Sequence, residues 1–85
     1  GMTLSYGTYT GPVKNGYPNG KGKLVYTKSR QINKYDSKGI VAQPGEYVEG
    51  LFVNGFLTVG KHYSADGQLL NKISAGVAEG VYEAK

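Results

Sequence analysis

Short apolar and tyrosine-containing runs alternate along this chain with turn-forming stretches of glycine, asparagine, aspartate and proline. Runs of this kind are typical of strands when residues that favour turns bound them. The pattern predicts strands near residues 6–13, 22–27, 31–35, 40–42, 46–53, 57–63 and 68–73. Two of the turns contain an Asn-Gly pair, which favours a type I′ hairpin turn with positive φ at both residues; these are Asn15-Gly16 and Asn54-Gly55. Strands joined by such short turns pair with their neighbours, so the pattern predicts an antiparallel meander.

Composition strengthens the all-β prediction. The 85 residues include 14 glycines and 8 tyrosines but no tryptophan and no cysteine. Glycine costs about 1 kcal/mol at each position inside a helix, which disfavours long helices in this chain. The length corresponds to one small domain, residues 1–85, and the lack of cysteine excludes a disulfide framework or a cysteine-ligated metal site.

The sequence also bears on targeting and on its own first residue. No apolar run approaches the roughly 20 residues that a membrane-spanning helix needs. The opening residues GMTLSYGT have neither the charged nor the apolar region of a signal peptide. We therefore expect no signal peptide and no transmembrane segment in this chain. Gly1 precedes Met2, and we interpret Gly1 as a residue left by cleavage of an affinity tag.

An internal repeat becomes visible when the chain is shifted by 39 residues. The two segments share the pattern glycine, apolar residue, Asn-Gly and aromatic residue. The shift places Gly11, Val13, Asn15, Gly16 and Tyr17 on Gly50, Phe52, Asn54, Gly55 and Phe56, in that order. Beyond Gly55 the match loosens, and Gly60 is the nearest glycine to the expected positions. We interpret residues 68–73 as the start of a third, degraded unit, so that the chain is a short array of repeats.

The first unit carries a fixed pattern of tyrosine and glycine from residue 9 to residue 26: Tyr9, Gly11, Gly16, Gly20, Gly22 and Tyr26. It resembles the MORN repeat, a β-hairpin motif written Y-x-G-x-x-x-x-G-x-x-x-G-x-G. The second unit, at about 48–63, is degenerate. It keeps Gly50, Phe52, Asn54 and Gly55, but it has Val48 in place of the tyrosine, and Tyr47 lies one residue early.

This resemblance implies hairpins laid side by side in an open, twisted antiparallel sheet. In such a sheet Gly16 serves a turn, while Gly11, Gly20 and Gly22 leave room for an aromatic ring over the backbone. We expect Tyr9 and Tyr26 to supply this cover, with Val13 and Leu24 in the same layer. Residues 27–44 include an insertion that the repeat pattern does not contain, and we expect them to form a hairpin that extends the sheet.

The glycine- and lysine-rich stretch 9–26 also invites comparison with a phosphate-binding loop. Gly11 and Gly16 have the spacing of a P-loop, but Tyr17 stands where that motif requires lysine. No helix is predicted to follow, so the loop would lack the N–H donors and the dipole of a helix N-terminus. We therefore expect no nucleotide or other cofactor.

No catalytic or metal-binding constellation emerges either. His62 is the single histidine, and it lies within five residues of Ser64 and Asp66. A triad so crowded, at a predicted hairpin end and without an oxyanion element, is not expected to act catalytically. Glu46 and Glu49 have odd spacing on a strand and point to opposite faces, so they cannot form a carboxylate pair. We expect a protein that is not an enzyme and holds no metal.

Charge divides the chain into two halves. Residues 1–45 carry seven basic side chains against one acidic side chain, whereas residues 46–85 carry three against five. A basic half suits anionic lipid or nucleic acid, although lysine also solubilises exposed sheet faces and protects sheet edges. The basic side chains are Lys14, Lys21, Lys23, Lys28, Arg30, Lys34 and Lys38.

The predicted function is binding or scaffolding. An open sheet has two edges and an apolar face to cover, so we expect a protein partner or a homodimer formed through a sheet edge or face. The resemblance implies roles in protein assembly and at acidic phospholipids. The alternative is therefore peripheral binding of anionic phospholipid headgroups through the basic N-terminal half. Tyrosines between lysines could also stack nucleic acid bases, a hypothesis that we favour less because sheet packing explains the same tyrosines.

Overall fold

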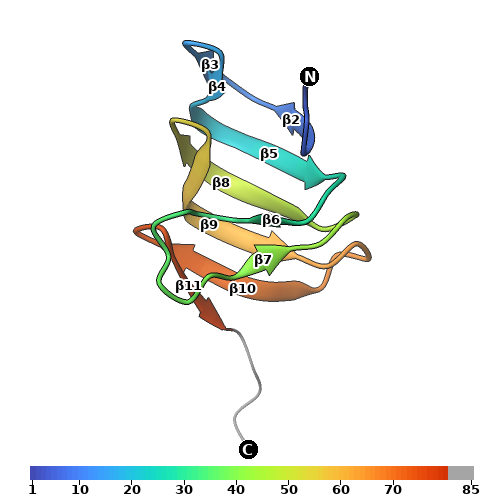
Figure 1. Cartoon of the computed structure of the whole chain (residues 1–85), viewed down its shortest axis with the longest axis vertical. Coiled ribbons are helices and arrows are strands. Elements are labelled where there is room, and N and C mark those ends of the chain that lie inside the picture. Colours follow the sequence, from blue (N-terminus) through green and yellow to red (C-terminus); the bar gives the residue numbers. More distant parts are fainter. Residues whose placement is uncertain (81–85) are drawn as a thin grey trace, which may run out of the picture.

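The computed structural model describes residues 1–80, and all of its regular elements are strands (Figure 1). Seven strands form one sheet in the order β1-β2-β5-β8-β9-β10-β11, and each neighbouring pair is antiparallel. Their bounds are β1 (Met2–Leu4), β2 (Gly7–Thr10), β5 (Gly20–Tyr26), β8 (Tyr47–Val53), β9 (Phe56–Tyr63), β10 (Leu69–Ser74) and β11 (Val77–Gly80). The predicted all-β fold, an open antiparallel sheet of sequential hairpins, is therefore confirmed.

Four short strands form two smaller sheets beside the large one. Strand β3 (Val13–Lys14) pairs with β4 (Tyr17–Pro18), and β6 (Arg30–Gln31) pairs with β7 (Val41–Ala42). The predicted strand 6–13 is thus split between β2 and β3. The break falls at Gly11, whose φ of 147° turns the chain out of the large sheet.

Strand prediction also misses the two-residue strand β4 and fails at three other places. The predicted strand 31–35 is wrong beyond Gln31, because the side chain of Asn33 accepts a hydrogen bond from the backbone N–H of Tyr35 at 2.8 Å and forms a local turn. The two edge strands β1 and β11 were not predicted. Strand β11 follows a turn at Ala75 and Gly76, with φ values of 52° and 79°, and alanine gives no sequence signal for such a turn.

Both Asn-Gly turns have the expected backbone. Asn15 and Gly16 have φ values of 53° and 82°, and Asn54 and Gly55 have values of 49° and 92°. Positive φ at both central residues is the feature that type I′ hairpins require.

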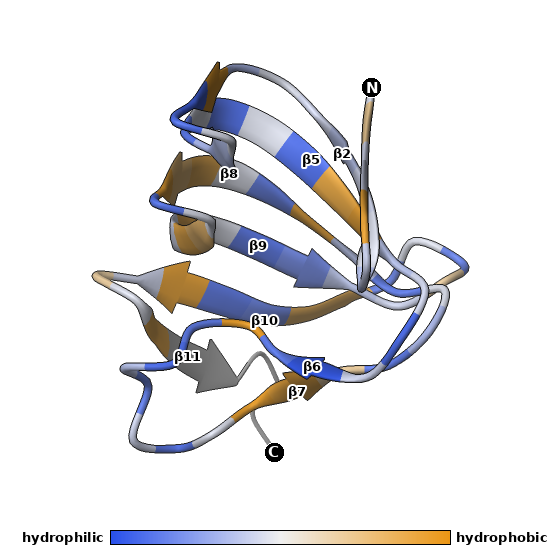
Figure 2. Cartoon of the chain, turned by 45° about the horizontal axis from the view of Figure 1, so that its top comes forward, coloured by the Kyte–Doolittle hydropathy of each residue, from blue (hydrophilic) through white to orange (hydrophobic). Residues whose placement is uncertain are grey.

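Residues 27–44, here called the covering segment, do not extend the sheet as expected. Strands β6 and β7 pair only with each other, and the segment crosses one face of the large sheet (Figures 1 and 2). The buried core lies between these two layers, with Ile32 and Ala42 contributed by the covering segment. The sheet contributes Tyr9, Leu24, Tyr26, Val48, Phe52, Leu57 and Ile73. The sheet therefore has one covered face and one open face.

A row of glycines crosses the covered face. Gly22, Gly50 and Gly60 are paired across β5, β8 and β9, and a Cβ atom added to Gly11 would lie 2.8 Å from the Cα of Gly22. The ring of Tyr9 lies over Gly22, where an added Cβ would be 2.6 Å from two ring atoms. Val13, which was expected in the same layer, is 48% exposed in the small β3–β4 sheet, so that expectation is wrong.

Candidate functional site

The open face of the sheet carries a row of charged side chains. Lys23, Glu49 and Lys61 are paired across β5, β8 and β9, and Lys72 on β10 is paired with Lys61. All four are exposed, and none of them forms an ion pair within the described part of the chain. From β5 to β10 the row therefore has three positive charges and one negative charge, and the backbone register continues it to Glu79 on the edge strand β11.

A second row on the open face is apolar. Leu51 is paired with Val59 and is 46% exposed, while Val59 is 50% exposed. Val77 on the edge strand β11 is 38% exposed, and it is paired with Ser74 of β10, the strand that lies between β9 and β11. We call Leu51, Val59 and Val77 the apolar row. Branched aliphatic side chains of this kind pack well on a sheet surface. No layer of the described chain covers these three.

Two tyrosine rings lie beside the charged row, on the side opposite the apolar row. Tyr47 and Tyr63 are paired on β8 and β9 and stack with centroids 4.8 Å apart and an interplanar angle of 17°. The Nζ of Lys23 lies 4.5 Å from the Tyr47 centroid, within the range of a cation–π contact. Along the strands, the open face thus carries an aromatic pair, then the charged row, then the apolar row.

A pocket of about 260 Å³ lies where the covering segment meets the turn between β8 and β9. Its lining residues are Asn33, Lys34, Tyr35, Val53, Asn54, Phe56 and Thr58. Beside it, the guanidinium carbon of Arg30 lies 3.6 Å from the Tyr6 centroid and 5.1 Å from the Phe56 centroid. The pocket therefore combines aromatic surface with nearby positive charge.

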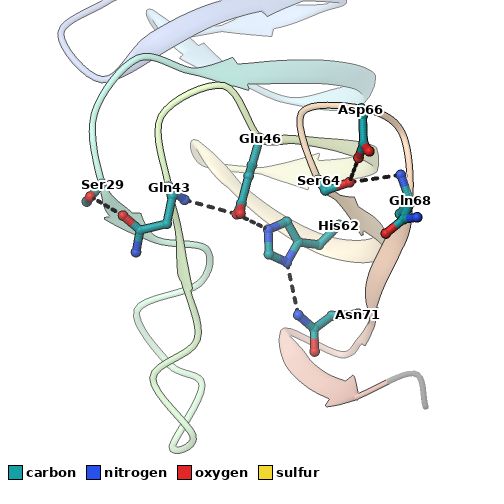
Figure 3. A network of polar contacts seen from close by, with 8 residues as sticks. All are labelled: Ser29, Gln43, Glu46, His62, Ser64, Asp66, Gln68 and Asn71. Carbon is teal, nitrogen blue, oxygen red and sulfur yellow. Dashed lines mark hydrogen bonds and ion pairs between the residues drawn. The ribbon is translucent and has the colours of Figure 1, made fainter. Parts of the chain in front are cut away.

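His62 is buried on the covered face within a chain of polar contacts (Figure 3). Its Nδ1 lies 3.0 Å from the side-chain nitrogen of Asn71, and its Nε2 lies 2.7 Å from Oε1 of Glu46. Because the Asn71 amide donates to Nδ1, the Nε2–H of His62 donates to Glu46. The same Glu46 oxygen accepts the backbone N–H of Gln43 at 3.0 Å, which ties the covering segment to the sheet.

The residues that suggested a triad do not assemble into one. Ser64 donates to Asp66 and accepts the backbone N–H of Gln68 at 2.9 Å, so these groups stabilise the turn between β9 and β10 (Figure 3). His62 instead pairs with Glu46. Sequence analysis missed this pairing because Glu46 and His62 are 16 residues apart and meet only through the register of β8 and β9.

The seven basic residues of the N-terminal half are not brought into one patch. Lys21 and Lys23 lie on the open face, whereas Arg30 and Lys34 lie on the covering segment beside the pocket. The remaining three are in the β3–β4 hairpin and in other parts of the covering segment: Lys14, Lys28 and Lys38.

Burial raises the pKa of two tyrosines of the first repeat unit. Burial raises the pKa of Tyr9, and the nearby backbone of Asn19 opposes this effect; the geometry gives the buried Tyr9 hydroxyl no hydrogen-bond partner. Burial raises the pKa of Tyr26 still further; the positive charge of Arg30 opposes this effect, and Tyr6 adds to it. Both rings thus remain neutral packing groups well above neutral pH.

Within residues 1–80 no group of three or more His, Asp or Glu side chains is placed to hold a metal ion. The same residues contain no helix that is long and apolar enough to cross a membrane. Comparisons of the chain with protein-family models, with curated proteins and with solved structures gave no significant match.

Proposed function

We propose that this chain is a MORN-like repeat module that performs no chemistry and docks another protein on its open sheet face. The apolar row carries this proposal. Leu51 and Val59 are paired neighbours that are each about half exposed, and they lie on a sheet face that no second layer of the described chain covers. Exposed apolar surface bordered by polar residues is typical of interaction sites.

The repeat assignment is supported by backbone conformation. Gly11 and Gly50 have φ values of 147° and 148°, and both are followed by an Asn-Gly turn with positive φ at each residue. The two units thus share the special conformations of their aligned residues, as expected of copies of one hairpin motif. This agreement supports a repeat of the MORN kind.

Charge indicates what the partner should look like. In the row beside the apolar row, the three lysines Lys23, Lys61 and Lys72 outnumber Glu49 and Glu79, and Lys21 is paired with Leu51. A partner with an apolar ridge flanked by carboxylates would match this face. A second copy of the chain, docked face to face, would bring two lysine-rich rows together, which disfavours a homodimer through this face.

Crosslinking from defined positions tests this proposal. A photoreactive residue in place of Val59 should capture an acidic partner in an extract of the source cells, whereas one in place of Val13 should not. Val13 is a matched control because it is equally exposed but lies in the separate β3–β4 sheet. With the purified partner, Leu51→Lys should weaken binding at least tenfold, since it places a charge in the apolar contact.

The outcomes separate the alternatives. Capture of a second copy of the chain, with a mass in solution of twice 9.1 kDa, would show a homodimer instead. Equal capture from positions 13 and 59 would overturn the open face as the docking site. The phospholipid alternative has weaker support because its seven basic residues are divided, and recovery with vesicles that depends on acidic lipid at low salt would favour it.

A further inference from the structure

The pocket beside Phe56 is distinct from the open face and has its own chemistry. The loop that follows β6 crosses the start of β9, as Figure 1 shows, and residues 33–35 form one wall. The turn between β8 and β9 forms the other wall. At about 260 Å³ the pocket lies just below the size of typical small-molecule sites, so it suits a compact ligand.

Its positive charge comes from Lys34. The Nζ of this exposed side chain lies 5.2 Å from the Tyr35 centroid and 5.5 Å from the Phe56 centroid. No acidic residue lines the pocket, and Lys34 forms no ion pair with any described residue. An ammonium group held over aromatic rings keeps most of its charge available to an anion, because cation–π contacts at exposed sites are weak.

The polar lining is partly fixed and partly free. Asn33 uses both ends of its amide, donating to the carbonyl of Leu57 at 3.1 Å and accepting from the N–H of Tyr35 at 2.8 Å. The side chains of Asn54 and Thr58 form no hydrogen bond within the described chain. They are therefore available to a ligand in a pocket whose wall Asn33 holds in place.

We propose that this pocket binds a small organic carboxylate with an aromatic or aliphatic body. The carboxylate meets the ammonium of Lys34 and accepts hydrogen bonds from Asn54 and Thr58, while the body lies against Phe56 and Val53. A single ammonium with neutral donors suits a monoanion. The guanidinium of Arg30, which would favour a phosphate dianion, lies over the rings of Tyr6 and Phe56 and is not part of the lining.

An NMR titration tests the assignment with phenylacetate as the probe. Saturable shifts are expected at the backbone amides of Tyr35, Asn54 and Phe56. Phenylacetamide, which has the same body without charge, should bind at least tenfold more weakly, and inorganic phosphate, which lacks the body, should not saturate. Lys34→Gln should weaken phenylacetate binding about tenfold. Lys28→Gln, which removes an exposed lysine of the same segment outside the pocket, should leave it unchanged.

Four results would overturn the proposal. Equal affinities for phenylacetate and phenylacetamide would show that the carboxylate does not contribute to binding. Phosphate binding as tight as that of phenylacetate would show an inorganic anion site. Binding of a peptide with a C-terminal phenylalanine carboxylate, but not of phenylacetate, would assign the pocket to a protein terminus. If Lys34→Gln showed the same chemical-shift changes and affinity as the unaltered protein, Lys34 would not contribute to binding. None of these results bears on the open face, which uses other residues.

Discussion

The two repeat units use the same backbone but fill it with different side chains. Their first glycines, Gly11 and Gly50, have nearly equal φ values, 147° and 148°. In the first unit the paired residues Tyr9 and Leu24 form an apolar layer on the covered face. In the second unit the corresponding pair is Val48 and His62, which are also buried. Val48, and not the neighbouring Tyr47, therefore takes the place that Tyr9 has in the first unit.

The glycines consequently serve two purposes, one of which is confined to the first unit. In the first unit Gly22 leaves room for the ring of Tyr9, which also packs edge-on against Phe52 with centroids 5.0 Å apart. The close approach of paired backbones is common to both units, since it occurs at Gly11 and Gly22 as well as at Gly50 and Gly60. A Cβ atom on Gly60 would lie 2.9 Å from the Cα of Gly50 and would collide with the carbonyl of Glu49. The second unit thus has the paired glycines without a covering aromatic ring.

The largest effect is expected from Gly50→Ala. Its Cβ would collide with the carbonyl of Val59 and lie 2.6 Å from the Cα of Gly60, at a φ of 148° that alanine rarely adopts. Strain and overpacking together should cost roughly 4 kcal/mol. That cost is comparable with the whole stability of a domain of this size, about 4–13 kcal/mol. Urea unfolding followed by circular dichroism measures it.

Gly16→Ala is the matched control. Gly16 also has a positive φ, of 82°, but an added Cβ would meet nothing within 4 Å. Only backbone strain remains, so the expected loss is about 1 kcal/mol. Similar losses for the two variants would show that strain, and not the close approach of β8 and β9, makes glycine necessary at position 50.

Tyr9→Val should have the next largest effect, because it gives the first unit the residue of the second. The ring of Tyr9 is fully buried over Gly22 and against Phe52, so the smaller valine would leave a cavity there. The expected cost is about 3 kcal/mol in the free energy of unfolding, with a lower urea midpoint. Tyr9→Phe keeps the ring and removes a buried hydroxyl that forms no hydrogen bond, so it should change stability by less than about 1 kcal/mol. If Tyr9→Phe lowered the free energy of unfolding as much as Tyr9→Val, the hydroxyl rather than the ring would be the source of the stability.

Sequence predicts the local features of both units well and the contacts between distant segments poorly. The positive φ values at Asn15-Gly16 and Asn54-Gly55 follow from turn chemistry and could be predicted. The place of the covering segment could not, since a hairpin with apolar residues can add to a sheet edge or lie on a sheet face. The covering segment lies on the sheet face because this position buries Ile32 and Ala42, and their burial depends on the whole core.

The candidate sites show the same limit. Strand alternation indicates that Lys21 and Lys23 share one face, but the apolar row depends on the register of β8, β9 and β11. The pocket depends on contacts between distant residues, such as Asn33 and the carbonyl of Leu57, which are 24 positions apart. Lys34 was among the predicted basic residues, yet its neighbour Phe56 came from the second repeat unit. Neither site has a local motif.

The ends of the two units differ as well, and pH dependence tests this difference. The first unit ends at Tyr26, which is buried. Counted from the corresponding paired residues Leu24 and His62, the second unit ends at Ser64, which is half-buried at the start of a turn. Burial raises the pKa of Tyr26 well above its usual value of about 10. Above pH 10 the unfolded chain releases this proton while the folded chain retains it, so the folded state binds more protons. Stability is therefore fully present below about pH 10 and falls above it by up to about 1.4 kcal/mol per pH unit for this group.

Tyr26→Phe isolates this contribution. Phenylalanine cannot ionise, so the free energy of unfolding of the variant should fall less steeply between pH 10 and pH 11.5, by up to about 1.4 kcal/mol per pH unit. Tyr9, whose pKa burial also raises, should keep part of the slope in the variant. Urea midpoints at several pH values measure both slopes. Tyr63→Phe on the open face serves as the control, because its ring is stacked on Tyr47 rather than enclosed in the core. Parallel curves for Tyr26→Phe and the unaltered protein would mean that Tyr26 ionises equally in both states, and the first unit would then end in the same solvated way as the second.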